Sequence, residues 1–428
     1  MRPTLHVLLC CLALAGCGDD GPGYYTEASL EVVQGINVLR LVGTPFEMGL
    51  QHGELMAPAL AEGVEFMEND PTFSMFLPMA RSMGLTQEAE ERSYPEAYDE
   101  CKGMAEASRR AGVEGWDLEK CISLAYGDVI IAFIEEMIGP GCTQFAAAGG
   151  ATADGRLVHG RNMDWDELSY LLDHPTVIVR RPEGQIPYLA IGFPGNVTPY
   201  NGMNAEGISI ASNDVSADPD QDPNVRGRRS FIQMIQQILS NCSSLDEVEE
   251  FFEAEPHSRA GIILVSDAKN RTAAVFEMTA SYTGIRRMDA DGLVYVTNHF
   301  THPDMENLDR PLDPECSSMA RLKRLDELLP PGGTASLHGG LDAATGITVL
   351  RDRYNPLTGE TYGTDVFDNN GSIATNGAVW SMIFLPEDHT FYMAAGQPPV
   401  PSHAYVGFDL DELLKGPGAQ PPDPPVYE

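Results

Sequence analysis

The residue types that could carry out nucleophilic chemistry gather around one cysteine. Cys142 opens an extended segment, and a second extended segment, which follows the turn signal Asp154-Gly155, contains Arg161 and Asp164. A strand that leaves Cys142, turns at Asp154-Gly155 and returns antiparallel would bring Arg161 and Asp164 back beside the sulfur. The spacing therefore predicts a hairpin that places a thiol, a guanidinium and a carboxylate together.

The thiol of Cys142 needs a base, because a cysteine with its reference pKa of about 8.5 is mostly protonated at neutral pH. None of the ten histidines has a sequence context that marks it as that base. The other available base is the α-amino group of the nucleophile's own residue, which titrates at about 7.7–8.0. This amine becomes free only if the chain is cleaved before Cys142. A cysteine protease with a Cys-His dyad and a non-enzymatic lipoprotein that acts as a binding module remain alternatives.

The peptide bond between Gly141 and Cys142 is suited to self-cleavage. Gly141 has no Cβ, so the sulfur can approach its carbonyl carbon, and Gly139-Pro140-Gly141 allows backbone shapes that would be strained elsewhere. Attack by the sulfur would convert the amide to a thioester, which water hydrolyses. Residues 37–141 would then form a helical propeptide, which we expect to remain associated as a small subunit.

The elements that must position this chemistry follow from the periodicity of apolar residues. Between Pro45 and about Met137 they recur every three or four positions, which predicts a helical block that ends at Ile138-Gly139-Pro140-Gly141. After Cys142 the pattern changes to short extended runs separated by turn signals, with helices near 229–239, 244–254 and 318–329. Runs of strands with interspersed helices predict an α+β fold of layered sheets covered by helices. Within it, Asn204 is expected to cap a turn.

Several segments together resemble the N-terminal nucleophile hydrolases. The chain is most similar to the acyl-coenzyme A:6-aminopenicillanic acid acyltransferase family, which is peptidase family C45. Choloylglycine hydrolases and penicillin V acylases are more distant relatives. The likeness covers about residues 37–405 and is carried by Gly43-Thr44-Pro45-Phe46-Glu47-Met48-Gly49, His52-Gly53, Gly141-Cys142-Thr143, Arg161-Asn162-Met163-Asp164, Gly202-Met203-Asn204-Ala205-Glu206-Gly207 leading to Asn213, and Val296-Thr297-Asn298.

The resemblance implies a four-layer αββα sandwich over residues 142–405 and gives Cys142 the part of nucleophile and, through its freed amine, of base. Arg161 would lower the pKa of the thiol by its positive charge, and Asp164 would hold the amine or the thiol by hydrogen bonding. A surface ion pair between Arg161 and Asp164 is the structural alternative. An inert buried thiol is the alternative for Cys142.

The same resemblance extends to three residues further along the chain. Asn213 would supply a hydrogen-bond donor to the oxyanion, and Asn298 a second contact to the amine or the oxyanion. Arg321, within Ser317-Ser318-Met319-Ala320-Arg321, falls where relatives keep an organising arginine. Asn298 could instead simply end a strand, and Arg321 could be a solvated helix residue.

The N-terminal segment of the chain indicates export. Residues 1–16 join one positive charge to a short apolar run, as secretory signals do. Leu14-Ala15-Gly16-Cys17 resembles the bacterial lipobox, in which the cysteine is lipidated; an ordinary signal peptide is the alternative. We expect residues 17–36 to form a flexible lipidated tether and 406–428 a proline-rich tail. The expected location is the membrane, either in the periplasm or on the cell surface.

An exported compartment permits disulfides. Cys101 and Cys121 lie on consecutive predicted helices and could bridge them, and Cys242 with Cys316 is a second candidate pair. Cys142 would stay unpaired, as a reactive thiol must.

Composition limits the partners. The net charge is −36, from 63 acidic and 27 basic side chains, which makes nucleic acid an unsuitable partner. No Cys-x-x-Cys pattern suggests zinc, and no metal or cofactor is expected. The expected substrate is the linear amide of an N-acylated small molecule or peptide. Acyl transfer from coenzyme A is less favoured than hydrolysis, because coenzyme A is cytoplasmic and this chain carries an export signal.

Overall fold

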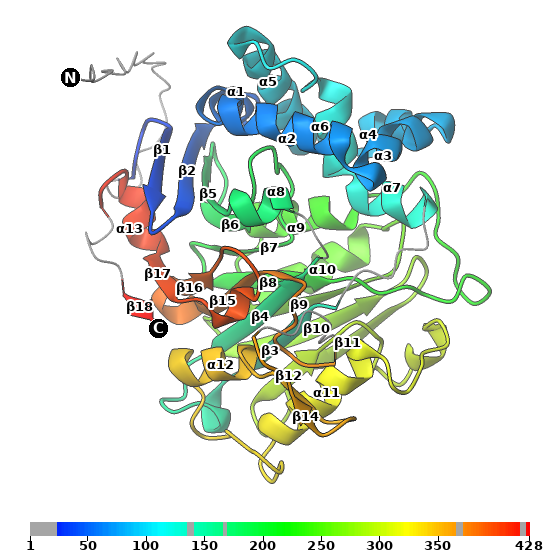
Figure 1. The fold of residues 1–428 in the computed structure, drawn as a ribbon, viewed down its shortest axis with the longest axis vertical. Coiled ribbons are helices and arrows are strands. Elements are labelled where there is room, and N and C mark those ends of the chain that lie inside the picture. The colour runs from blue at the N-terminus through cyan, green and yellow to red at the C-terminus, as the bar shows by residue number, and fades with distance from the viewer. Residues whose placement is uncertain (1–23, 135–140, 166–168, 365–370, 420–424) are drawn as a thin grey trace.

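Two large β-sheets face each other in the computed structural model, which describes residues 24–134, 141–165, 169–364, 371–419 and 425–428 (Figure 1). The nine-stranded sheet has the order β1 (Ser29–Val33), β2 (Ile36–Gly43), β5 (Thr176–Pro182), β6 (Tyr188–Gly192), β7 (Asn201–Asn204), β8 (Ile208–Asn213), β9 (Gly261–Asp267), β10 (Thr272–Met278) and β11 (Thr283–Arg287). The seven-stranded sheet has the order β12 (Leu293–Val296), β3 (Thr143–Ala147), β4 (Val158–Asp164), β15 (Ala378–Leu385), β16 (Thr390–Ala394), β17 (Tyr405–Asp409) and β18 (Val426–Tyr427). A small third sheet pairs β13 (Tyr354–Asn355) with β14 (Glu360–Thr361).

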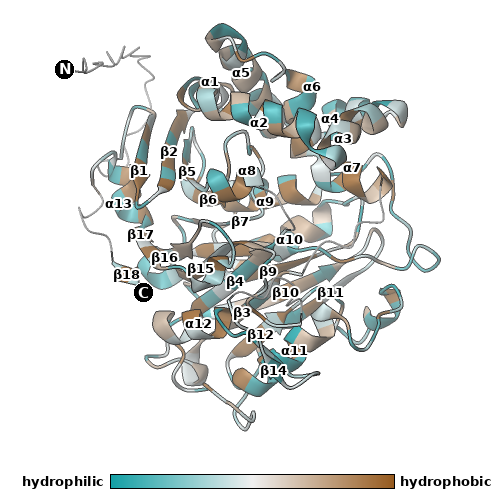
Figure 2. Ribbon diagram, in the orientation of Figure 1, coloured by the Kyte–Doolittle hydropathy of each residue, from teal (hydrophilic) through white to brown (hydrophobic). Residues whose placement is uncertain are grey.

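Helices cover both outer faces of this sandwich. The nine-stranded sheet packs against α9 (Phe231–Asn241) and α10 (Leu245–Ala254), and against a block formed by α1 (Pro45–Leu55), α2 (Ala57–Asn69), α3 (Pro71–Ser82), α4 (Leu85–Arg92), α5 (Pro95–Ala111), α6 (Leu118–Ala125) and α7 (Gly127–Ile134). The seven-stranded sheet packs against α11 (Ser317–Leu328) and α12 (Ala343–Leu350), and two shorter helices, α8 (Ser169–Asp173) and α13 (Leu410–Lys415), complete the fold. Figure 2 shows apolar colouring along α7 and α12. The layers confirm the expected α+β class and αββα sandwich.

The apolar core between the sheets explains why the strands are apolar on both faces. One inner cluster joins Val177 and Leu189 of the nine-stranded sheet to Trp380 and Phe391 of the seven-stranded one. Each of these side chains is at most 1% exposed. A strand that is covered on one side by the other sheet and on the opposite side by helices has no solvated face.

The helical block begins with a strong local signal. Thr44 and Glu47 form a capping box at the start of α1, where Pro45 occupies the first turn. Gly49 and Gly53 then let α1 approach α5 closely, because a Cβ at Gly49 would lie 2.9 Å from the backbone nitrogen of Met104. A disulfide between Cys101 on α5 and Cys121 on α6 closes the block, as the sequence favoured, with a Cα–Cα distance of 5.5 Å.

The other candidate disulfide is wrong: Cys242 and Cys316 are both free. Cys242 follows α9 on the outer side of the nine-stranded sheet, whereas Cys316 precedes α11 on the outer side of the seven-stranded sheet. Two sheets therefore separate the sulfurs, and a disulfide needs Cα atoms within about 7 Å.

Both terminal boundaries expected from the sequence also need correction. β1 and β2 lie within the expected tether and at the start of the expected helical propeptide, yet they form the edge of the nine-stranded sheet, where β2 pairs with β5 in parallel. At the other end, residues 405–415 form β17 and α13, whose Leu410, Leu413 and Leu414 are buried, rather than the start of an extended tail. Their apolar side chains pack between the sheets. The proline- and glycine-rich composition of the residues that follow hid this packing from the sequence analysis.

Buried polar contacts attach the helical block to the sheet. Glu100 on α5 pairs with Arg180 on β5 at 2.9 Å, with both side chains at most 1% exposed. His52 on α1 accepts a hydrogen bond from the backbone of Gly195 at 2.9 Å. Asp128 on α7 accepts from the Ser230 hydroxyl at 2.7 Å and from the Phe231 amide at 2.8 Å, at the first turn of α9. The block is thus an integral layer of the fold.

Replacing Asp128 with alanine is expected to lower the free energy of unfolding by about 1–3 kcal/mol, because the Ser230 hydroxyl and the amide at the start of α9 lose a buried acceptor. Urea unfolding followed by circular dichroism measures this change. Asp99→Ala is the control, since Asp99 on α5 makes an exposed ion pair with Lys102 and should cost less than about 1 kcal/mol. Equal effects of the two substitutions would contradict the prediction.

None of the described helices is long and apolar enough to cross a bilayer.

Candidate functional site

The predicted hairpin is present. β3 and β4 pair antiparallel in a register that sets Thr143 opposite Asn162 and Gln144 opposite Arg161. Since side chains alternate between the faces of a strand, Cys142, Gln144 and Arg161 all point to the face that looks at the nine-stranded sheet. The hairpin therefore delivers the thiol and the guanidinium to the inside of the sandwich.

Cys142 and its two expected partners lie together in this interior. Nη2 of Arg161 donates to Sγ of Cys142 at 3.5 Å, and Asp164 lines the same cavity as both. Their exposed fractions are 6% for Cys142, 1% for Arg161 and 5% for Asp164. A surface ion pair between Arg161 and Asp164 is thereby excluded, because neither side chain reaches solvent.

Burial dominates the acidity of the thiol. Loss of hydration raises the pKa of Cys142 above its ordinary value. The positive charge of Arg161 lowers this pKa, and the carboxylate of Asp164 raises it further. The charge of Arg161 thus lowers the thiol pKa as expected, but burial has the larger effect. The Cys142 thiol is therefore protonated at neutral pH.

Self-cleavage before Cys142, which the sequence analysis predicts, is expected to become about tenfold faster for each pH unit between about pH 6 and 8. The thiolate is the attacking form, and its fraction grows about tenfold per unit while the pH stays below the raised thiol pKa. Following the uncut chain by mass spectrometry after cell-free synthesis measures this rate. Arg161→Gln should slow cleavage at every pH in that range, because it removes the charge that lowers the pKa. A rate independent of pH would contradict the prediction.

Asn213 reaches Cys142 from the opposite sheet. It ends β8, and its Nδ2 donates to the carbonyl oxygen of Thr297 at 2.8 Å and to that of Cys142 at 3.3 Å. Nε2 of Gln144 donates to Oδ1 of Asn213 and so fixes which end of the amide faces Cys142. Sequence reasoning missed Gln144; its position two residues after Cys142, on the same face of one strand, is the signal that could have found it.

Arg321 and Asn298 lie on the other side of Cys142. Nη1 of Arg321 donates to the carbonyl oxygen of Cys142 at 2.5 Å and to the Thr143 hydroxyl at 2.9 Å, and Nη2 donates to Oδ1 of Asn298 at 2.9 Å. Nδ2 of Asn298 donates to the Asp214 carbonyl at 2.8 Å. Arg321 is only 1% exposed, so the reading of it as a solvated helix residue is wrong.

Gly141 is packed against this arginine. A Cβ at Gly141 would overlap the guanidinium of Arg321 and would lie 2.8 Å from Oδ1 of Asn298. Four hydrogen bonds hold that guanidinium, the fourth being from Nε to the Ser317 hydroxyl at 3.1 Å. The position before Cys142 thus has room for glycine alone unless Arg321 moves.

A cavity of about 110 Å³ lies beside Cys142. Its walls are rich in apolar and aromatic side chains, and one of them, α7, belongs to the helical block. The described lining residues are Asp128, Ile131, Cys142, Arg161, Met163, Asp164, Trp165, Tyr200, Ser212, Asn213, Asp214, Phe231, Ile232, Arg259 and Gly261. This lining suits an apolar group attached to a reactive polar centre.

Histidine is absent from this lining among the described residues. His159 lies near by on β4, but its Nδ1 faces the Ser209 hydroxyl at 3.0 Å and burial lowers its pKa to about 3. A neutral, buried imidazole bonded to another residue is unsuited to serve as base for Cys142. In the described part of the chain, no three His, Cys, Asp or Glu residues are grouped as a metal site requires.

Comparison with known proteins agrees with these observations. Residues 151–399 match the model of the acyl-coenzyme A:6-aminopenicillanic acid acyl-transferase family. The chain belongs to this family. The resemblance noted in the sequence is therefore confirmed, and the matched residues include Arg161, Asp164, Asn213, Asn298 and Arg321 but begin after Cys142.

Individual relatives are distant. An uncharacterized protein of Archaeoglobus fulgidus is 25% identical over 352 residues, which are 71% of this chain and 58% of that protein. The chain thus spans little more than half of that relative's length.

Similar solved structures are also distant in sequence. A Caenorhabditis elegans N-acylethanolamine-hydrolyzing acid amidase ortholog is 17% identical, with a TM-score of 0.39, over 57% of this chain and 93% of that one. A variant of the conjugated bile acid hydrolase from Clostridium perfringens is 18% identical, with a TM-score of 0.37, over 64% and 94%. Penicillin V acylase from Agrobacterium tumefaciens is 15% identical, with a TM-score of 0.35, over 64% and 88%.

Proposed function

We propose that this protein cleaves itself between Gly141 and Cys142 and then uses the new N-terminal cysteine to hydrolyse a linear amide. The observation that carries the proposal is the placement of the Cys142 sulfur 3.5 Å from the Arg161 guanidinium, inside a cavity and directly after a glycine that has no room for a side chain. Membership of an acyl-transferring family supports the same chemistry.

Self-cleavage proceeds through a thioester. Sγ of Cys142 loses its proton and attacks the carbonyl carbon of Gly141, and the bond from that carbon to the Cys142 nitrogen breaks. The nitrogen takes up the proton and becomes a free amine. Water then hydrolyses the thioester, which leaves a carboxylate on Gly141 and restores the thiol.

Amide hydrolysis follows the same pattern with a bound substrate. The free amine of Cys142 accepts the thiol proton, and the thiolate attacks the substrate carbonyl carbon. Asn213, held by Gln144, donates to the oxyanion, with Asn298 as the second contact. The amine then protonates the leaving nitrogen, and water resolves the acyl-enzyme. Asp164 holds the amine in this scheme.

The cavity indicates an apolar acyl half. Trp165 and Tyr200 meet edge to face with ring centroids 5.5 Å apart, and Met163, Phe231 and Ile232 complete the apolar lining. Such a surface favours an alkyl or aryl acyl group over a charged one. Acyl transfer to an acceptor other than water remains a secondary activity of the same acyl-enzyme.

The helical block stays with the enzyme after cleavage in this proposal, as a small subunit. β1 and β2 are strands of the main sheet, and Asp128 and Ile131 of α7 line the cavity. Removing the fragment would therefore expose the core and open the site.

Anchoring to a membrane through Cys17 is a separate proposal. It is supported by the lipobox-like segment Leu14-Ala15-Gly16-Cys17, which lies outside the described residues. Metabolic labelling with a fatty acid should mark the full-length protein in bacteria, and Cys17→Ser should abolish the label and release the protein from membranes. Equal labelling of the two chains would overturn this proposal.

Intact-mass analysis tests the main proposal. Purified wild type should yield two fragments that meet at Gly141/Cys142, while Cys142→Ala should remain whole and inactive towards a panel of N-acyl amides. Cys242→Ala, which removes another buried free cysteine, should be cut and active. A whole, active wild type would favour a Cys-His protease, and a whole chain that never reacts with thiol-directed acyl probes would favour a binding module.

A further inference from the structure

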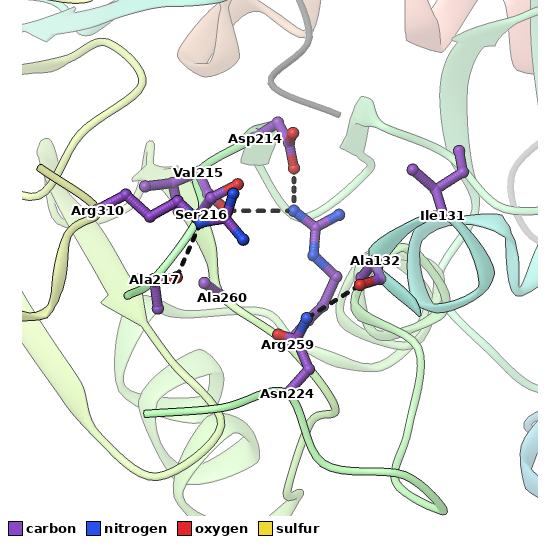
Figure 3. A pocket seen from close by; sticks show the side chains of 10 residues that line it. All are labelled: Ile131, Ala132, Asp214, Val215, Ser216, Ala217, Asn224, Arg259, Ala260 and Arg310. Carbon is purple, nitrogen blue, oxygen red and sulfur yellow. Dashed lines mark hydrogen bonds and ion pairs between the residues drawn. The ribbon is translucent and has the colours of Figure 1, made fainter. Parts of the chain in front are cut away.

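The side chain of Asn298 is held from two sides. Its Oδ1 accepts a hydrogen bond from Nη2 of Arg321 at 2.9 Å, and its Nδ2 donates to the carbonyl oxygen of Asp214 at 2.8 Å. The carboxylate of Asp214 is itself paired with Arg259, as Figure 3 shows. These contacts orient the amide group of Asn298, but they do not fix its backbone.

The backbone of Asn298 is held by a single hydroxyl group. The N–H of Asn298 donates to Oγ of Ser318 at 2.8 Å. Ser318 lies in the first turn of α11, three residues before Arg321, and is only 6% exposed. Residues three apart are neighbours on one side of a helix. The same side of α11 therefore holds the backbone of Asn298 through Ser318 and its side chain through Arg321.

The hydroxyl of Ser318 belongs to a buried set of hydrogen bonds. Nδ1 of His299 lies 2.7 Å from it, and it donates to the hydroxyl of Thr297 at 2.9 Å. The Thr297 hydroxyl donates in turn to the carbonyl oxygen of Ser318 at 3.1 Å. A hydroxyl donates one hydrogen bond and accepts two. With the ring proton of His299 on Nδ1, Ser318 accepts from Asn298 and His299 and donates to Thr297, so its bonding capacity is filled.

The position of Asn298 affects Asn213 as well, because the two segments brace each other. Nδ2 of Asn213 donates to the carbonyl oxygen of Thr297, the residue before Asn298. Nδ2 of Asn298 donates to the carbonyl oxygen of Asp214, the residue after Asn213. A displacement of the Asn298 backbone would therefore disturb both residues that are proposed to contact the oxyanion.

From this arrangement we infer that Ser318 is a positioning residue for the reaction: its hydroxyl, oriented by His299, holds Asn298 where its amide meets the oxyanion. The inference rests on the amide hydrolysis proposed for Cys142. Ser318 is not among the described residues that line the cavity beside Cys142. Its effect on the reaction therefore passes through Asn298.

Ser318→Ala tests the inference on material already cleaved before Cys142. Outright removal of an oxyanion donor costs about 10²–10³-fold in rate, so displacement of one is expected to lower kcat about tenfold. KM should stay within about twofold, because the oxyanion is absent from the bound ground state. Ser240→Ala is the matched control: Ser240 is another buried helical serine, which donates to the Gln236 carbonyl on α9, and its loss should leave kcat unchanged. A wild-type kcat in Ser318→Ala would overturn the inference.

A double-mutant cycle separates positioning from a general loss of structure. If Ser318 acts through Asn298, Ser318→Ala should cost about tenfold in the wild-type background but less than about twofold in an Asn298→Ala background. Rates are divided by the cleaved fraction, which intact mass supplies. The same factor in both backgrounds would show a general structural defect and would contradict the inference.

Two variants of His299 give a decision without altering Asn298 or Ser318. Burial lowers the pKa of His299 to about 4, so the ring is neutral at neutral pH and its contribution is a hydrogen bond rather than a charge. His299→Asn, whose Nδ2 can replace Nδ1 as donor, should keep a kcat close to that of the wild type. His299→Leu should lose about as much as Ser318→Ala. Equal kcat values for the two variants would count against the inference.

Failure of the proposed function looks different from failure of this inference. In the first case the wild type would be uncut before Cys142 or would hydrolyse no N-acyl amide, and the inference would fall with it. In the second case the wild type would be cleaved and active, and Ser318→Ala would match it in kcat.

Discussion

The Gly141→Ala chain is expected to remain in one piece, with self-cleavage slowed at least about 100-fold. A methyl group at this position overlaps the Arg321 guanidinium. That guanidinium cannot swing away freely, since it is bonded to the Cys142 carbonyl, the Thr143 hydroxyl, Oδ1 of Asn298 and the Ser317 hydroxyl. The Gly141 carbonyl carbon must therefore move relative to the sulfur, and displacement of about 1 Å from a reactive geometry can cost about 100-fold. Intact mass after timed incubation measures the loss.

Gly150→Ala is the control for this substitution. Gly150 lies between β3 and β4, in the same hairpin connection, and a Cβ there meets no atom within 4 Å. That chain should cleave at the wild-type rate. Cleavage of Gly141→Ala at the wild-type rate would show that the contact with Arg321 does not hold the scissile bond.

The Asn213→Ala enzyme is expected to lose about 10²–10³-fold in kcat, the usual cost of removing one donor to an oxyanion. Nδ2 of Asn213 is directed at the backbone of the nucleophile, and its orientation is fixed by Gln144. The loss should fall on kcat rather than KM, because the oxyanion exists only in the transition state and the intermediate. Steady-state kinetics on the best N-acyl amide, with material already cleaved before Cys142, provide the measurement.

Asn204→Ala is the matched control, an asparagine of the same sheet with a different task. Oδ1 of Asn204 accepts from the amides of Glu206 at 3.1 Å and Ile208 at 3.0 Å, which is the turn-capping role expected from the sequence. Its loss should lower thermal stability and leave kcat near the wild-type value. An Asn213→Ala enzyme with wild-type kcat would exclude Asn213 as an oxyanion donor.

Gln144 supports the role expected of Asn213. Its side chain contacts Asn213 rather than the reacting atoms, so it is a positioning residue. Gln144 on β3 donates to Asn213 on β8, and this hydrogen bond links the two sheets beside Cys142. This link explains why a residue far from Cys142 in sequence can face its carbonyl.

The hairpin around Cys142 was predictable because its determinants are local. Alternation along β3 and β4 and the Asp154-Gly155 turn fix which residues share a face, and the register of Gln144 with Arg161 follows from them. The helical block was predictable for the same reason: its apolar residues recur every three or four positions, and proline and glycine mark its end. The disulfide between Cys101 and Cys121 on neighbouring helices was predictable as well.

The convergence of Asn213, Asn298 and Arg321 on Cys142 could be expected only through the family resemblance. These residues come from β8, from the loop after β12 and from α11. No local sequence pattern predicts how such distant segments pack against one another. The same holds for Cys242 and Cys316, where a plausible pairing failed because two sheets lie between them. Strand pairing between β2 and β5 was equally hidden, because it joins segments far apart in the sequence, on either side of Cys142.

By itself, the sequence predicted that Arg161 and Asp164 lie beside Cys142 and that a helical block precedes them, because turns and side-chain periodicity act over a few residues. Tertiary structure alone decided that the pKa of the Cys142 thiol is raised, that Gly141 packs against Arg321, and that α7 lines the cavity. Desolvation and steric exclusion depend on everything packed around a group, and those neighbours come from distant parts of the chain.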